Sequence, residues 1–240
     1  MEPNPYDPPK SEVEDVSLSA AALGEFRDPT KLTSWAKRLL YALVVISLIA
    51  IVSGVLEHQV LRDLQNGSFG SEADATAAAN SSDARQVFVG VLQFGAFVAS
   101  GIVLLMWIYR ASFNARQLGA EDMQFSPGWA VGWYFIPFLN LWKPYQAMKE
   151  IWQASANPAN WRAESIPSLL GWWWLFWVAS NLVANASFRM SLRAKEMDAL
   201  LAANVVTLVS DVLEIPLCLI VLALVGRIHR MQMSEAARRS

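Results

Sequence analysis

Four long stretches without charged residues constrain what this chain can fold into. They cover residues 39–56, 87–109, 166–188 and 199–225, the last interrupted by Asp211 and Glu214. A helix of roughly 20 apolar residues crosses about 30 Å of hydrocarbon. Only 17% of the residues are charged and 54% are hydrophobic, against about 25% and 45–50% in soluble domains. The pattern predicts an all-α fold, a four-helix transmembrane bundle.

A fifth uncharged stretch, 128–142, is short for a crossing. We expect segment 128–152 to be an additional Pro-kinked, aromatic re-entrant or interfacial helix. With four crossings, the Lys and Arg residues gather on the side that holds both termini. The other side keeps Arg62, Arg85, Arg189, Arg193 and Lys195. Because cytoplasmic loops are enriched in Lys and Arg, both termini are predicted to be cytoplasmic.

The domain organisation follows from these stretches. Residues 1–36 are predicted to be an acidic, proline-containing cytoplasmic tail, 37–230 the membrane domain and 231–240 a second cytoplasmic tail. The first apolar run lies too far from the start for a secretory signal. Segment 57–85, rich in Gly, Ser, Ala and Asn, is predicted to be a mobile external connection.

Composition argues against several classes of function. The net charge of −2 offers no basic excess for nucleic acid, and the single cysteine cannot form an intrachain disulfide. His58 and His229, expected in loops on opposite sides, cannot assemble a metal site or a serine–histidine pair. No phosphate-binding glycine loop occurs. We therefore expect no enzyme, no cofactor, no metal and no nucleic-acid partner.

One motif is long enough to be specific. It runs from the end of the second stretch into a tryptophan-rich helix, and its characteristic residues are Arg110, Asn114, Pro127, Gly128, Trp129, Pro137, Asn140, Pro144, Tyr145 and Trp152. Over about 104–177 the chain resembles a family of bacterial integral membrane proteins known as domain of unknown function 4328. The resemblance implies a multi-pass protein of the bacterial inner (plasma) membrane and supplies no reaction.

The prolines of this motif have a direct physical consequence. Pro137 cannot donate to the carbonyl of Trp133, nor Pro144 to that of Asn140, so a helix here would be broken twice. We expect the side-chain amide of Asn140 to supply a local donor. An interfacial helix anchored by aromatic residues is the preferred interpretation, and a kinked element lining a ligand or ion path is the alternative.

A polar seam is predicted between the last two stretches. Asn204, Thr207, Asp211 and Glu214 share one helical face, and Asn181 and Asn185 are four residues apart on the preceding helix. An acid within the bilayer is a functional-site hypothesis by default. The two interpretations are hydrogen-bonded structural contact, which we prefer, and a proton or cation relay.

These patterns favour a non-enzymatic accessory or interaction module in the membrane. The alternative is a small transporter or channel subunit that uses the acidic seam, which would require an oligomer. The expected partners are the lipid bilayer and either a second copy of the chain or another membrane protein.

Overall fold

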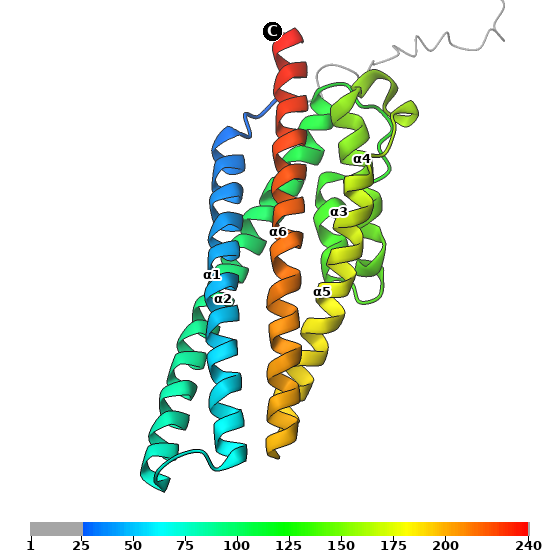
Figure 1. Ribbon diagram of the computed structural model, residues 1–240. Coiled ribbons are helices and arrows are strands. Elements are labelled where there is room, and N and C mark those ends of the chain that lie inside the picture. The colour runs from blue at the N-terminus through cyan, green and yellow to red at the C-terminus, as the bar shows by residue number, and fades with distance from the viewer. Residues whose placement is uncertain (1–25, 240) are drawn as a thin grey trace, which may run out of the picture.

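The computed structural model describes residues 26–239, and within this range the chain is helical and has no strand. The all-α prediction is therefore confirmed for the described part of the chain (Figure 1). The elements are α1 Thr30–Asn66, α2 Glu72–Gln117, α3 Pro127–Gly132, η1 Trp133–Phe135, η2 Leu139–Leu141, α4 Lys143–Ala156, η3 Pro158–Ala163, α5 Ser168–Arg193 and α6 Met197–Arg239.

Three of these helices, α1, α2 and α6, are long and apolar enough to cross a membrane. Four were predicted from the sequence. The fourth, α5, has 26 residues and a length of roughly 39 Å, which is sufficient for a crossing. Its tryptophans, serines and two asparagines lower its hydropathy, because these side chains favour the membrane interface or a protein neighbour. Its crossing stays a prediction.

The long helices run antiparallel, with α1 packed between α2 and α6, and α6 packed between α1 and α5 (Figure 1). The turns α1–α2 and α5–α6 lie at one end of the bundle, which we call the turn end. The start of α1, the last turns of α6, and α4 lie at the opposite end, which we call the motif end. The start of α1 and the end of α6 thus lie at the same end of the bundle.

Gly54 allows α1 to approach α6 closely. A Cβ atom at this position would lie 2.7 Å from Cδ2 of Leu208, nearer than side chains approach one another. Ser47, Ala50 and Ser53 are also buried on α1. Small residues on one face let transmembrane helices pack at short distance. The α1–α6 contact therefore depends on the lack of bulk on α1.

The segment predicted as one kinked helix consists of several short elements. Pro127 and Pro144 each occupy the first turn of a helix, α3 and α4, where a missing N–H costs nothing. Pro137 separates η1 from η2, and Phe138 follows it with a φ of 64°. The side chain of Asn140 was predicted to supply a local donor. The donor in the structure is its backbone N–H, which bonds to the carbonyl of Ile136 at 3.0 Å. The prolines thus set boundaries between elements.

Helices extend into three segments that were predicted as a connection or as tails. Segment 57–85 is mostly helical, because α1 continues to Asn66 and α2 begins at Glu72, after Ser71 caps it by accepting from the N–H of Asp74. At the other end, α1 begins inside the predicted tail 1–36, and α6 continues through the predicted tail 231–240 to Arg239. Residues 1–25 of the predicted acidic tail lie outside the described residues.

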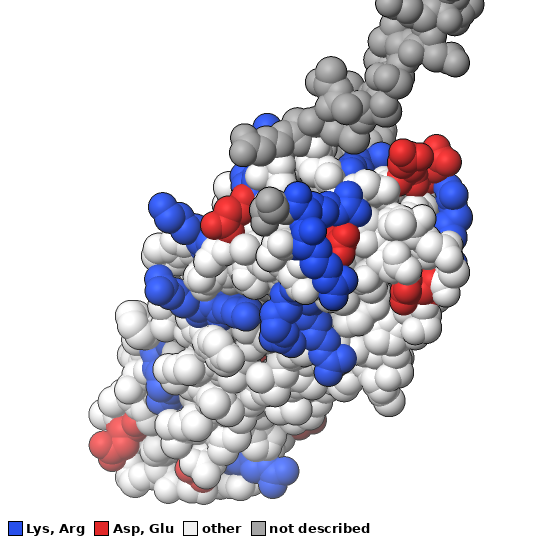
Figure 2. All heavy atoms as spheres, turned by 90° about the horizontal axis from the view of Figure 1, so that it is seen from above, with Lys and Arg blue, Asp and Glu red and all other residues white. Residues whose placement is uncertain are grey.

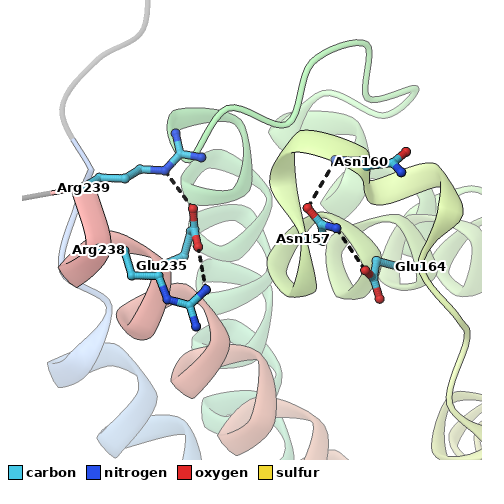
Figure 3. A network of polar contacts seen from close by, with 6 residues as sticks. All are labelled: Asn157, Asn160, Glu164, Glu235, Arg238 and Arg239. Atoms are coloured by element: carbon cyan, nitrogen blue, oxygen red, sulfur yellow. Dashed lines mark hydrogen bonds and ion pairs between the residues drawn. The ribbon is translucent and has the colours of Figure 1, made fainter.

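Short polar networks stabilise the end of α6 and the segment that follows α4, both at the motif end (Figure 3). In the last turns of α6, Glu235 pairs with Arg238 at 3.4 Å and with Arg239 at 2.9 Å. After α4, the side chain of Asn157 accepts from the N–H of Asn160 and donates to Glu164. These contacts are local, so they stabilise helix ends and leave the packing between helices to other groups.

Candidate functional site

The predicted acid Asp211 lies inside the bundle and bonds to α2. Its side chain is 8% exposed, and its Oδ1 accepts a hydrogen bond of 2.8 Å from Nε2 of Gln93. At membrane depth no water competes for either group. The pair therefore connects α6 to α2, a helix that otherwise touches α6 little.

Asn204 connects α6 to α1. Its amide donates to the carbonyl of Gly54 at 3.1 Å and to Oε2 of Glu57 at 2.9 Å. Its Oδ1 lies 3.0 Å from Nδ1 of His58, which must be the donor because the amide oxygen can only accept. Both histidines were predicted to lie in loops. In the structure His58 lies on α1 and His229 lies on α6.

Thr207 and Glu214 face different neighbours. The Thr207 hydroxyl donates to the carbonyl of Ala203 and therefore accepts from Ser187 of α5, with the two oxygens 2.7 Å apart. Half-buried Glu214 interacts with the hydroxyl of Ser47 on α1. The four predicted polar residues of α6 thus bind three different helices. We call Asn204, Thr207, Asp211 and Glu214 the α6 polar row.

Asn181 and Asn185 do not join this row, which corrects the predicted pairing. Both are exposed, and the amide of Asn181 donates to the carbonyl of Trp177 in its own helix. The α5 residues that face inward, Trp173 and Ser187, are fourteen positions apart and so lie on one face. Asn185 is two residues from Ser187, or roughly 200° around the helix. The asparagines therefore point away from α6.

The partners of the α6 polar row were not predicted from the sequence; they are Ser47, Gly54, Glu57, His58, Gln93 and Ser187. Gln93 had a usable signal, because it and Ser100 are the polar side chains of the apolar stretch 87–109. Its pairing with Asp211 depends on the tilt of α2 relative to the other helices. The spacing of residues along the sequence carries no information about this tilt.

At the motif end, Asn114 anchors the chain that precedes α1. Its side chain is fully buried, donates to the carbonyl of Arg27 at 2.8 Å and accepts from the N–H of Arg27 at 3.2 Å. One side-chain amide can thus satisfy both the N–H and the carbonyl of a residue that lies outside any helix, because it offers a donor and an acceptor. This motif residue therefore has a structural role.

Glu150 is a buried acid that orders the segment entering α3. It is 5% exposed, and its two carboxylate oxygens accept from the backbone N–H groups of Gln124 and Phe125. Arg116 donates to the carbonyls of Met123 and Phe125 at 3.0 and 2.7 Å. Burial raises the pKa of the Glu150 carboxyl above its usual value of 4.5, while the two N–H groups oppose the rise.

The aromatic motif residues pack against one another and against α5. Trp129 stacks on Trp133 with ring centroids 4.7 Å apart, and Tyr145 meets Trp174 at 5.8 Å. Trp152 is buried in the main apolar core with Trp107 and Trp173. Gly128 has open space where a side chain would start.

Between residues 26 and 239, no cluster of His, Cys, Asp or Glu could hold a metal ion.

Positive side chains gather at the motif end (Figure 2). Around Gly226 on α6, a Cβ atom would lie 3.3 Å from Nζ of Lys37 and 3.6 Å from a guanidinium nitrogen of Arg230. Both side chains lie at the level where the apolar stretches end, which is the usual place for basic residues beside a membrane.

Three helices suited to membrane crossing, joined by polar contacts in their apolar parts, define a helical membrane-type protein. The family described as a domain of unknown function (DUF4328) matches residues 70–230, so the chain belongs to this family. The match is wider than the motif at 104–177 and includes α2 and most of α6. Comparisons with curated proteins and with solved structures found no match.

The Asp211–Gln93 contact can be measured by a double-mutant cycle. Asp211→Asn keeps the acceptor oxygen and should leave stability nearly unchanged. Asp211→Leu and Gln93→Leu each leave one polar group unpaired, and the double variant removes both. We expect a coupling free energy of about 0.6 kcal/mol, and at most about 1.7 kcal/mol, from unfolding in bicelles. Strict additivity would show that the two side chains do not interact.

Glu150 should make stability depend on pH in a defined direction. Because burial raises its pKa, the folded protein binds the proton more tightly than the unfolded chain does. The contribution of Glu150 to stability should therefore fall as the pH rises from 4.5 through the folded-state pKa. The unfolding free energy can be measured from pH 4 to 7 for the parent and for Glu150→Gln. The value of the parent minus that of the variant should decline as the pH rises. A difference that grows with pH would contradict this assignment.

Proposed function

We propose that this protein is a non-enzymatic interaction module of the bacterial inner membrane, with four crossings and cytoplasmic termini. The observation that carries the proposal is the polar face of α5, formed by Asn181 and Asn185 and left uncovered. We call it the α5 amide face. The family match and the three apolar helices support the membrane location.

An uncovered amide is costly in hydrocarbon, because lipid tails offer it no hydrogen-bond partner. Asn181 satisfies one donor within its own helix. Its remaining groups, and those of Asn185, can be satisfied by the polar side chains or backbone of another transmembrane helix. Asparagine is among the residues that hydrogen-bond across such helices. The α5 amide face is therefore suited to dock a helix from outside this bundle.

The relay interpretation has less support. A relay requires groups that pass a proton or cation along one path, whereas Asp211 is bonded to α2 and Glu214 faces α1. Each group of the α6 polar row contacts a partner from the protein, as expected of structural contacts. A function based on association therefore accounts for more of the polar groups than transport does.

The crossing of α5 can be tested by cysteine accessibility. In a Cys218→Ala background, Gly70→Cys and Lys195→Cys place a thiol at the turn end, and Glu121→Cys places one at the motif end. With four crossings, a membrane-impermeant maleimide should label the first two in intact cells and the third only after permeabilisation. Labelling at Gly70→Cys without labelling at Lys195→Cys would exclude a crossing by α5.

Docking on the α5 amide face can be tested by photo-crosslinking in native membranes. Phe188 follows Asn185 by three residues and is 65% exposed, while Phe94 on α2 is 70% exposed and serves as a matched control. A photoreactive phenylalanine analogue at position 188 should form protein adducts several times more often than one at position 94. The double change Asn181→Leu and Asn185→Leu should remove the excess.

The mass of the adduct identifies the partner as a second copy or as another protein. Helix content by circular dichroism should be the same in all variants, so that a loss of adduct is not a loss of fold. Equal yields at positions 188 and 94, or a yield that the leucine changes do not affect, would refute the proposal.

A further inference from the structure

A groove lies on the surface where α1, α2 and α3 meet. It has a volume of about 400 Å³ and is lined by Leu32, Ile102, Leu105, Met106, Tyr109, Arg110 and Val131. Ile102 and Met106 are each 55% exposed along it. Arg110 is its one charged lining residue. An apolar trough with a single cation fits a ligand that has an apolar chain and an anionic group.

The level of the groove in the bilayer follows from the sequence. The uncharged stretch of α2 ends at Tyr109, and Arg110 is the next residue. Basic side chains and tyrosines favour the boundary between hydrocarbon and headgroups. Met106 and Ile102 lie one and two turns deeper, respectively, within the apolar part of α2. The cation therefore lies at headgroup level and the apolar walls extend toward the hydrocarbon.

The guanidinium of Arg110 is available for a ligand. In the part of the chain that the structure describes, the ion pairs join Arg162 to Asp122 and Arg238 and Arg239 to Glu235, and none includes Arg110. No hydrogen bond of its side chain occurs within residues 26–239 either. Arginine binds phosphate through two parallel N–H donors, which gives such pairs both strength and geometry.

The geometry points to a binding site for one anionic phospholipid in this groove. The lipid phosphate pairs with Arg110, Tyr109 lies beside the glycerol region, and one acyl chain lies along Ile102 and Met106. The net negative charge of the lipid matters because Lys and Arg gather at the same end of the bundle (Figure 2) and attract anionic headgroups. This site gives the motif residue Arg110 a role independent of the α5 amide face.

The test uses the full-length protein exchanged into detergent containing phosphatidylglycerol and phosphatidylcholine in equal amounts, with bound lipid counted by native mass spectrometry. The parent should retain one phosphatidylglycerol with about tenfold preference over phosphatidylcholine, because the choline cation of phosphatidylcholine competes with the guanidinium of Arg110 for the shared phosphate; tenfold corresponds to about 1.4 kcal/mol. Arg110→Gln should lose the preference. Met106→Trp fills the groove while keeping the charge, and should retain neither lipid.

Arg227→Gln is the matched control, since Arg227 is a basic residue at the motif end outside the groove. It should bind lipid as the parent does. Circular dichroism and elution volume establish that each variant is folded. A preference that survives in Arg110→Gln, an equal loss in Arg227→Gln, or unchanged retention in Met106→Trp would each overturn the site. None of these results depends on whether α5 docks a partner.

Discussion

The arrangement of this bundle depends on the hydrogen bonds that α6 makes within its apolar part. Lipid tails attract a helix about as well as another apolar helix does, so apolar faces alone do not set which helices pair or in what register. Polar groups do, because each must find a partner in a medium without water. Asn204 binds α1, Thr207 binds α5 and Asp211 binds α2. Three neighbours are thereby placed around one helix.

Gly54 shows how packing and hydrogen bonding support each other. Its carbonyl accepts from Asn204, and its missing side chain leaves the space that Leu208 occupies. A larger residue would hold the two helices apart and lengthen the hydrogen bond. The same glycine thus serves both the apolar and the polar contact between α1 and α6.

Much of the fold was predictable from the sequence, because apolar length and the spacing of Asn204, Thr207, Asp211 and Glu214 depend on one helix at a time. The neighbours of Asn181 and Asn185 were not predictable, since they depend on how α5 is rotated about its axis. Trp173 fixes that rotation by entering the motif-end core. Segment 57–85 was mispredicted because its small polar residues are equally compatible with a loop and with exposed helix, and tertiary contacts such as Arg85 to Ser53 decide.

The motif residues act mainly on the motif end. Asn114 holds the chain before α1, Pro127 and Pro144 begin helices, and Trp152 fills the core. Together with Glu150 they build a cap over one end of the bundle, and this cap contacts α5 at its start. Among the described residues, α6 is the main neighbour of α5. A helix fixed at one end and packed on one side keeps its opposite face open, and on α5 that face carries the two asparagines. The cap therefore determines which face of α5 is left exposed.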